Sequence, residues 1–343
     1  VKLLSGNNFY KGEWQESNPQ TVRAMSAVGF YFGRKILNSE SIPIGLIDLS
    51  IGGAPIESFI RPEALLQDAN FNKKMSGDWL KNEHLPIWPK ERGLQNLGAR
   101  TDIPGDEYGG NHGFKPGFAF DAGLRSLTNF PVAGIIWYQG ESNAQEQERV
   151  NEYNDLMKLM IGDYRELWKN PAMPFYWVQL SSIDTANYKS HYWPEFRNNQ
   201  RLLLDQISHG GMAVSSDIGA KNDVHPRNKK WVGERLANWA LNNYYKRKVT
   251  VSGPLPLSAK WKNGKLIVTF QYARGLTAKD KKIIRGFSVN GKPIDVVKVK
   301  GNKVILRPSE KPQTVEYGWS PFTDANLVNN EDLPASTFSI KVN

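Results

Sequence analysis

The stretch Trp137-Tyr138-Gln139-Gly140-Glu141-Ser142-Asn143 places a dense cluster of polar residues directly after an apolar run. That run, residues 133–138 (Ala-Gly-Ile-Ile-Trp-Tyr), is rich in β-branched and aromatic side chains, which is typical of a core strand. Apolar residues then recur at three- and four-residue spacing over residues 150–168, which predicts a helix. In open α/β sheets, ligands bind at the carboxyl ends of the strands, so the polar cluster is a candidate site. A plain turn in which Ser142 or Asn143 caps the following helix would explain the same residues.

Strands and helices alternate in the same way along residues 1–248. We expect strands near 44–49, 133–138, 175–180 and 212–216, and helices near 22–37, 150–168, 194–204 and 230–245. This order predicts an α/β domain whose parallel sheet is covered by helices on both faces. Residues 66–118 are rich in Gly, Pro and Asn and break the alternation. Because a loop of that length in a compact domain is usually functional, we expect it to cross the active site.

The pattern changes from about residue 249 to short strands without intervening helices. Turn signals such as Asn263-Gly264 and Asn290-Gly291 separate these strands. The strands are expected at residues 265–271, 286–289, 295–299, 303–306 and 314–317. Residues 249–343 are therefore predicted to form a smaller all-β module. It is either a structural cap or a carbohydrate-binding accessory, and the structural role is favoured because no site assembles there.

Composition excludes several classes of protein. The 343 residues contain no cysteine, which rules out disulfides, cysteine nucleophiles and thiolate metal sites. No run approaches the roughly 18 apolar residues of a membrane span. The net charge is +10, but the lysines are scattered and no nucleic-acid motif accompanies them, so we expect a solvated basic face and no nucleic-acid partner. Neither a metal-binding motif nor a phosphate-binding loop occurs, so we expect chemistry without a cofactor.

A second polar motif, Asn222-Asp223-Val224-His225-Pro226, precedes the helix expected at 230–245. His225 is the one histidine of five that has a carboxylate two residues away at a strand-to-helix junction. A histidine beside an acid is the minimum for a base that deprotonates a nucleophile while the carboxylate orients the ring. The same D-x-H spacing also arises by chance, in which case His225 is a surface turn residue.

Further motifs accompany these two: S-A-V-G-F-Y-F-G-R at 26–34, P-I-G-L-I at 43–47, S-I-G-G-A-P-I-E at 50–57, V-G-E-R-L-A at 232–237, S-G-P-L at 252–255 and L-P-A-S at 333–336. Together with W-Y-Q-G-E-S-N and D-V-H-P, they resemble the sialate O-acetylesterase family of the SGNH (GDSL-like) hydrolases over nearly the whole chain. The resemblance implies a flavodoxin-like parallel sheet sandwiched by helices in a catalytic domain over residues 1–248, with the all-β module at 249–343.

The resemblance also implies ester hydrolysis and assigns roles to the acid–base motif. His225 would deprotonate the nucleophile and then protonate the leaving sugar hydroxyl, while Asp223 would hold the other ring nitrogen. SGNH enzymes commonly place that acid three residues before the histidine, where this chain has Asn222. A dyad in which a backbone carbonyl orients the His225 ring therefore stays open.

The donors for the tetrahedral oxyanion are implied in the same way. The backbone N–H of Gly53 and the side-chain amide of Gln139 would form the oxyanion hole. Glu141 and Asn143 would support these groups or contact the sugar.

One expected block is absent from the sequence. Members of the family carry their nucleophilic serine in a G-Q-S-N-M-like block upstream of the helix at 26–34, and this chain contains neither that block nor a G-x-S-x-G elbow. Ser5-Gly6-Asn7-Asn8 has the wrong order and reads as a polar turn. We therefore interpret the catalytic domain as N-terminally incomplete, with the serine on a segment upstream of Val1. Ser50 and Ser142 are the internal alternatives.

We expect a carbohydrate O-acetylesterase whose partner is an acetylated sugar, with O-acetylated sialic acid as the favoured substrate. The alternatives are an acetyl-xylan or other plant-glycan deacetylase on the same fold, and a non-catalytic glycan-binding protein. Arg61, Arg92 or Arg100 would be able to pair with a sialate carboxylate. An extracytoplasmic location, periplasmic or secreted, would suit this function.

Overall fold

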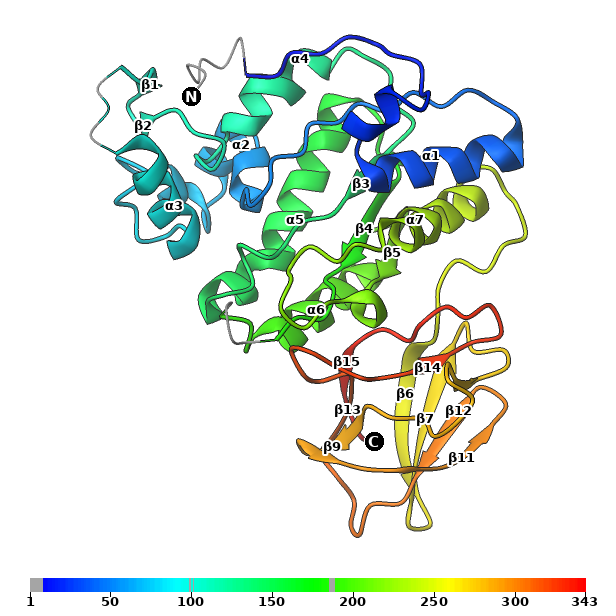
Figure 1. The fold of residues 1–343 in the computed structure, drawn as a ribbon. Helices are drawn as coiled ribbons and strands as arrows, with labels where there is room; N and C mark the ends of the chain where they lie inside the picture. Colours follow the sequence, from blue (N-terminus) through cyan, green and yellow to red (C-terminus); the bar gives the residue numbers. More distant parts are fainter. Residues whose placement is uncertain (1–8, 99, 101, 185–188) are drawn as a thin grey trace. The chain divides into compact units, whose positions relative to one another are not determined.

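The structure, a computed structural model, describes residues 9–98, 100, 102–184 and 189–343 (Figure 1). The stretch Ser5-Gly6-Asn7-Asn8 lies outside these residues. The chain forms two compact units. The first unit comprises Val1–Ser26, Ile47–Ile135 and Gln139–Met173, and the second unit comprises Ala27–Leu46, Ile136–Tyr138 and Pro174–Asn343. The proposed boundary between residues 248 and 249 stays a prediction.

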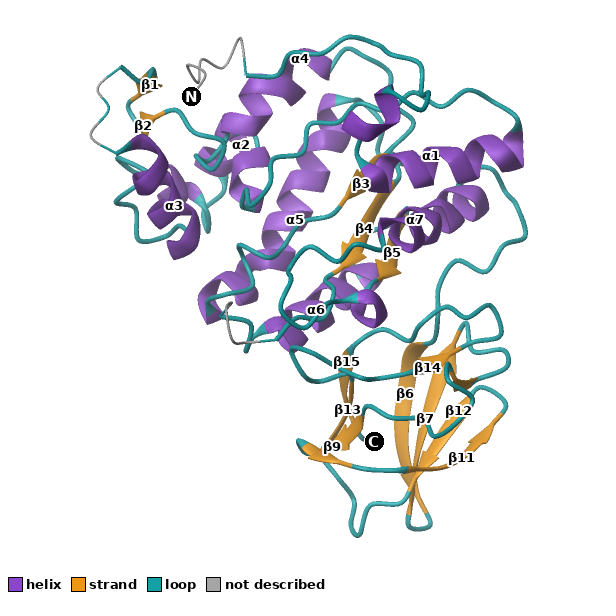
Figure 2. Ribbon diagram, in the orientation of Figure 1, coloured by secondary structure: helices purple, strands orange, loops and turns teal. Residues whose placement is uncertain are grey.

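The second unit contains a three-stranded parallel sheet of order β3-β4-β5 (Figure 2). Its strands are β3 (Ile135–Trp137), β4 (Phe175–Gln179) and β5 (Gly210–Val214). Three helices of the unit belong with the sheet: α1 (Ala27–Glu40), α6 (Trp193–Leu202) and α7 (Lys229–Asn243). All five residues of β4 are buried, as expected for a strand covered on both faces.

Alternate side chains of β4 face different helices. Tyr176 and Val178 join the apolar core that contains residues of α1 and α7. On the other face, the Trp177 indole N–H donates to the carbonyl of Gln200 in α6 at 2.9 Å. The period-2 alternation of a strand thus places one helix layer on each face. The predicted α/β class is confirmed.

Residues 41–50 contain no strand, although the apolar alternation predicts one at 44–49. Ile44 and Leu46 are half-buried and approach Gly33 of α1, whereas Ile47 is 40% exposed. A strand requires a neighbouring strand that accepts and donates its backbone hydrogen bonds. The apolar pattern indicates an extended segment but does not specify that neighbour, so this prediction is wrong for the structure described.

The C-terminal region of the second unit consists of antiparallel sheets, as predicted. One has the order β11-β12-β7-β6, and a second has the order β10-β9-β13-β15. The strands are β6 (Leu255–Lys262), β7 (Lys265–Gln271), β9 (Phe287–Val289), β10 (Lys292–Pro293), β11 (Val296–Lys300), β12 (Lys303–Leu306), β13 (Thr314–Tyr317) and β15 (Phe338–Lys341). A short pair, β8 (Thr277–Ala278) with β14 (Leu327–Val328), completes the region.

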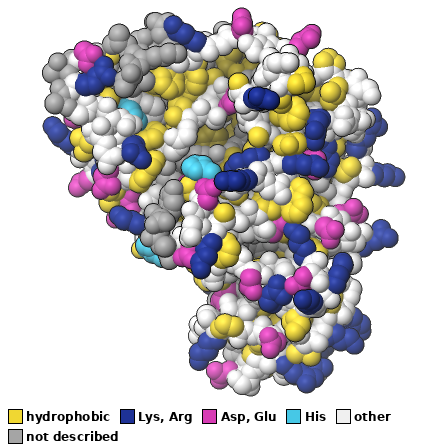
Figure 3. Space-filling view, viewed as in Figure 1, with side chains coloured by type: hydrophobic (Ala, Val, Ile, Leu, Met, Phe, Trp, Pro, Cys, Tyr) yellow, Lys and Arg dark blue, Asp and Glu magenta, His cyan; other side chains and the backbone are white. Residues whose placement is uncertain are grey.

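Two hairpin turns in this region follow directly from their sequence. Asn263-Gly264 and Asn290-Gly291 each have positive φ at both residues, as the type I′ turn requires. Lysines on the β region, among them Lys260, Lys262 and Lys265, are exposed. On the face shown in Figure 3, basic side chains are interspersed with acidic ones instead of forming one continuous patch.

The first unit is mainly helical. Its longest helix is α5 (Gln147–Leu167), which follows the W-Y-Q-G-E-S-N stretch. Short elements occupy residues 56–127: η3 (Ile56–Phe59), α2 (Pro62–Gln67), η4 (Asn72–Met75), α3 (Ile87–Leu97), β1 (Gly105–Asp106), β2 (Gly109–Gly110), η5 (Phe120–Leu124) and α4 (Arg125–Leu127). No helix among the described residues of either unit is long and apolar enough to cross a membrane.

The described residues of 66–118 thus form an insertion with its own small core, not a structureless loop. Trp79 is buried and donates its indole N–H to the carbonyl of Gly110 at 2.9 Å. His112 stacks on Trp79 and meets Phe114 edge-on. The His112 Nδ1 accepts the N–H of Phe114 at 3.1 Å, and its Nε2 lies 3.0 Å from the Asn96 side-chain nitrogen. These contacts leave the imidazole neutral.

The buried imidazole should make the protein less stable in mild acid. Burial lowers the pKa of His112 from 6.5 to about 4, so the unfolded chain binds a proton at higher pH than the folded one. As pH falls from about 6.5 to 4, the free energy of unfolding should therefore decrease, by on the order of 3 kcal/mol from this residue. Urea denaturation at a series of pH values measures it. The decrease should shrink in His112→Gln, and an identical decrease in that variant would contradict the assignment.

Candidate functional site

Two turns of the first unit, residues 53–56 and 139–143, are joined side by side by hydrogen bonds. The three bonds run from Ser142 Oγ to Gly53 O (2.6 Å), from Gln139 Nε2 to Ala54 O (3.2 Å) and from Ile56 N to Asn143 Oδ1 (3.1 Å). The structure therefore brings together three of the predicted site residues: Gly53, Gln139 and Asn143.

The alternative in which Ser142 or Asn143 caps the following helix is wrong. Helix α5 begins at Gln147, its N-cap residue is Glu146, and no side chain caps it there. Ser142 and Asn143 are buried and direct their polar atoms to the 53–56 turn. Their polar side chains therefore form hydrogen bonds between two segments that are distant in the sequence.

Gly53 has the conformation and exposure that a backbone donor requires. Its φ is +79°, which glycine adopts without strain, and the residue is exposed. Within the described residues, no acceptor engages its N–H. Trp88 of α3 lies directly beside it, because a Cβ on Gly53 would be 2.7 Å from the Trp88 ring. The insertion at 66–118 thus supplies an aromatic wall next to the Gly53 turn.

Gln139 is buried and held on both ends of its side-chain amide. Its Nε2 donates to Asn143 Oδ1 at 2.8 Å as well as to the Ala54 carbonyl, and its Oε1 accepts from the Tyr153 hydroxyl at 3.1 Å. An oxyanion bound by this amide would replace the Ala54 carbonyl, the more distant of the two acceptors. Glu141 is half-buried, and its backbone carbonyl accepts from Gln145. The catalytic roles of Gln139 and Glu141 stay predictions.

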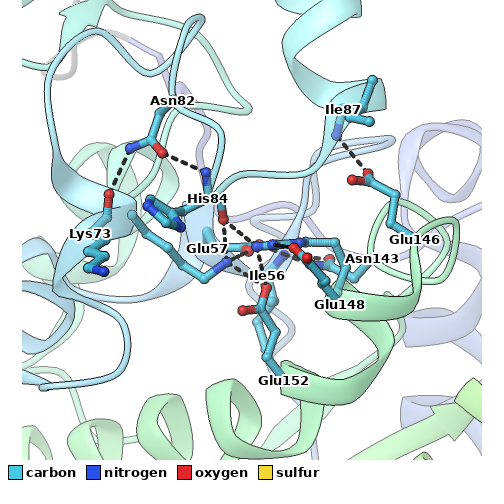
Figure 4. Close-up of polar contacts among 12 residues, drawn as sticks. Ile56, Glu57, Lys73, Asn82, His84, Ile87, Asn143, Glu146, Glu148 and Glu152 are labelled. Carbon is cyan, nitrogen blue, oxygen red and sulfur yellow. Dashed lines mark hydrogen bonds and ion pairs between the residues drawn. The ribbon is translucent and has the colours of Figure 1, made fainter.

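A cluster of buried charges lies behind Asn143 (Figure 4). Asn143 Nδ2 donates to Glu57 Oε2 at 3.0 Å, and Lys74 Nζ donates to Glu57 Oε1 at 2.9 Å and to Glu152 Oε1 at 2.6 Å. Arg149 donates to Glu152 at 2.7 Å and to the same backbone carbonyl, that of His84, that accepts from Lys74. Two cations and two carboxylates thus pair with one another, and Arg149 also donates to the exposed Glu148 at 2.8 Å.

The charge balance sets the protonation of the two carboxylates. Burial by itself would raise the pKa of Glu57, but the Lys74 ammonium and the Asn143 amide together hold that pKa below its ordinary value. Burial raises the pKa of Glu152. Glu57 belongs to the S-I-G-G-A-P-I-E motif and Lys74 to the insertion, but neither had a predicted role. The sequence signal that would have indicated a role for Glu57 is its position as a charged residue inside a motif of small and apolar residues.

The acid–base motif lies in the second unit. The Asp223 carboxylate accepts the backbone N–H of His225 at 2.8 Å, and the same oxygen is 3.7 Å from the ring Nδ1. The second distance exceeds that of a hydrogen bond. The His225 side chain is 80% exposed. Asp223 therefore shapes the turn that carries His225, and its role as ring orienter stays a prediction, as does the pairing of His225 with the Gly53 turn.

The internal serines have partners that bear on their use as nucleophiles. Ser142 is buried and its hydroxyl is directed at the Gly53 carbonyl. Ser50 is exposed, and its hydroxyl donates to the Asp48 carboxylate at 2.7 Å. Neither hydroxyl contacts a histidine in the bonds that the described residues form.

Two of the three candidate arginines already pair with carboxylates. Arg61 binds Asp163 through Nε at 2.9 Å and through Nη2 at 2.5 Å. Arg100 binds Asp102 through the same two nitrogens. Arg92 lies over the Trp88 ring, with its guanidinium carbon 5.9 Å from the centroid. No group of three or more His, Asp or Glu side chains in the described part of the chain is arranged to hold a metal ion.

Replacing Gly53 by alanine should destabilise the first unit. The new Cβ would occupy a left-handed backbone conformation and clash with the Trp88 ring, so we expect a loss of roughly 1–3 kcal/mol in the free energy of unfolding. Urea denaturation checks it. Gly52→Ala is the matched control, because a Cβ there meets no atom within 4 Å and should change stability little. Equal effects at the two positions would contradict this description of the turn.

Comparisons with known proteins agree on one family. A family model described as carbohydrate esterase, sialic acid-specific acetylesterase matches residues 120–242. The sialate O-acetylesterase of Homo sapiens is 29% identical over 280 residues, which are 76% of this chain and 47% of the relative. That of Rattus norvegicus is 28% identical over 286 residues, 75% of this chain and 50% of the relative. The chain therefore spans about half the length of the curated relatives it matches.

The similarity extends to a solved structure. A carbohydrate acetylesterase from Xanthomonas citri superposes with a TM-score of 0.79 at 27% identity, covering 97% of this chain and 69% of that one. The family match spans β3, α5, the central sheet and the His225 turn, so it includes the motifs at 137–143, 222–226 and 232–237. The chain is thus similar to the sialate O-acetylesterase family of carbohydrate esterases in its central part and over about three quarters of its length.

Proposed function

We propose that the protein to which this chain belongs is a carbohydrate O-acetylesterase that releases acetate from acetylated sugars. The observation that carries the proposal is the Gly53 turn, which exposes a backbone N–H beside an aromatic wall and is tied to the family's Q-G-E-S-N motif. The match to the family model and the names of the relatives support the same activity.

The proposed reaction is acyl transfer through a serine. The serine oxygen attacks the acetyl carbonyl while His225 takes its proton, and the tetrahedral oxyanion accepts from Gly53 N–H and the Gln139 amide. His225 then protonates the leaving sugar oxygen. Water, deprotonated by His225, hydrolyses the acetyl-enzyme and regenerates the serine. Asp223 would hold the imidazolium if its carboxylate turned from the His225 backbone to the ring.

The serine of this proposal lies upstream of Val1. The contacts of the two internal candidates support this placement: among the described residues, the Ser142 hydroxyl bonds a carbonyl and the Ser50 hydroxyl bonds Asp48, and neither bonds a histidine. We further propose O-acetylated sialic acid as the substrate, following the relatives' names, and an extracytoplasmic location, periplasmic or secreted.

The placement of the serine is tested by acetate release from 9-O-acetylated sialic acid. The 343-residue chain should be inactive, and a polypeptide extended upstream through the serine block should be active. In the extended polypeptide, His225→Ala should lower kcat by about 10³ or more with little change in KM. The control is His209→Asn, which keeps an exposed turn residue of positive φ and should leave kcat unchanged. Activity of the 343-residue chain by itself would place the nucleophile inside it and make Ser50 and Ser142 the targets.

The sugar preference is tested by kcat/KM for 9-O-acetylated sialic acid against acetylated xylooligosaccharide. We expect the sialate to be the better substrate. Equal or better turnover of the xylooligosaccharide would favour the plant-glycan deacetylase. Sugar binding without acetate release by the extended polypeptide would favour the non-catalytic alternative.

A further inference from the structure

We propose that Glu57, paired with Lys74, is a positioning residue that orients the side-chain amides of Asn143 and Gln139 and so holds the Gly53 turn in its donor conformation. The consequence for catalysis rests on the proposed esterase function. The orientation of the amides is a property of the fold and is testable without that function.

The orientation of Asn143 follows from the chemistry of the Glu57 carboxylate. An ionised carboxylate only accepts hydrogen bonds. Glu57 Oε2 faces Asn143 at 3.0 Å, so the asparagine must present its Nδ2 there. Its Oδ1 then faces the opposite way, where it accepts from Ile56 N and Gln139 Nε2. Asn143 is fully buried, so water does not substitute for any of these partners.

The orientation of Asn143 in turn determines the orientation of the Gln139 amide. Because Asn143 Oδ1 is an acceptor, Gln139 must direct its Nε2 toward it, and this places the Gln139 Oε1 near the Tyr153 hydroxyl. The hydroxyl must then donate. The Glu57 carboxylate, together with the Ile56 N–H, thus sets the direction of a chain of hydrogen bonds that ends at the two turns of the candidate site.

Lys74 keeps Glu57 in its accepting form. Glu57 is 0% exposed and Lys74 is 2% exposed, so neither charge is solvated by water. The Lys74 ammonium donates three hydrogen bonds, to Glu57, to Glu152 and to the His84 carbonyl. A buried pair of this kind contributes little net stability compared with apolar residues of the same size, but removing one partner is costly. A gain in stability therefore does not explain why an ion pair, and not a pair of apolar residues, occupies this position. The orientation that the carboxylate imposes on the neighbouring amides does explain it.

The isosteric variant Glu57→Gln tests the proposal because it preserves shape and removes the charge. A glutamine presents one oxygen and one NH₂ group, so it places a donor against either the Lys74 ammonium or the Asn143 amide. In the extended polypeptide we expect kcat to fall about 10- to 100-fold while KM changes less than about threefold. The midpoint of thermal unfolding should fall as well.

The double variant Glu57→Gln/Lys74→Met separates positioning from stability. It removes both buried charges, so the midpoint of thermal unfolding should recover toward the wild-type value. The value of kcat should stay low, because Asn143 then loses the carboxylate acceptor of its Nδ2 and keeps only the Ile56 N–H as an orienting partner outside its own turn. Recovery of kcat together with the midpoint would overturn the proposal.

The ion pair of Arg61 with Asp163 provides a matched control in the same unit. It is a close pair with a buried carboxylate, and its hydrogen bonds do not involve the 53–56 or 139–143 turns. Asp163→Asn should lower the unfolding midpoint and leave kcat within about twofold of the wild-type value. A loss of kcat equal to that of Glu57→Gln would show that both variants act through general destabilisation and would overturn the proposal.

A readout without substrate distinguishes this inference from the proposed function. In protein labelled with ¹⁵N at Asn and Gln side chains, the amide signals of Asn143 and Gln139 should shift in Glu57→Gln and stay in place in Asp163→Asn. Loss of single signals in Asn143→Asp and Gln139→Glu identifies them. Unchanged signals in Glu57→Gln would overturn the positioning role. The expected shifts in a protein that hydrolyses no acetyl ester would contradict the esterase proposal alone.

Discussion

The side-chain amide of Asn143 is the contact on which the candidate site depends. It is fully buried and bonds the Gly53 turn through Ile56 N, its own turn through Gln139 and the interior through Glu57. A buried amide deprived of such partners costs the full desolvation energy of its polar atoms, so the bonds must form together or not at all. The Gly53 turn is therefore held by this buried amide together with the bond from Ser142 Oγ to the Gly53 carbonyl.

The insertion at 66–118 contributes both to the surface of the candidate site and to the buried contacts that support it. It contributes Trp88 beside Gly53 and Lys74 beneath Glu57. An exposed ammonium would not hold a buried carboxylate ionised, so Lys74 has to be enclosed, and the insertion and α5 enclose it together through Glu152. The insertion therefore makes two separate contributions to the candidate site, one through Trp88 and one through Lys74.

The acid–base turn of the second unit is built differently. The Asp223 carboxylate accepts a hydrogen bond from the His225 backbone N–H, and the His225 ring is exposed. The turn is anchored from the other side by α7, where the Asn228 side chain accepts from Trp231 N. This arrangement holds the backbone of His225 and leaves its ring exposed, which is compatible with the proposed role of His225 as a base.

The sequence by itself determined the α/β alternation, the all-β C-terminal region and the Asn-Gly hairpins, because periodicity and turn chemistry are properties of neighbouring residues. It also located Gly53, Gln139 and Asn143 through their motifs. Only the tertiary structure decided that residues 44–49 form no strand, that Asn143 is no helix cap, and that Glu57 meets a residue 86 positions away. Backbone pairing and buried polar partners are chosen across the fold, and no local pattern encodes which distant group will supply the hydrogen bond.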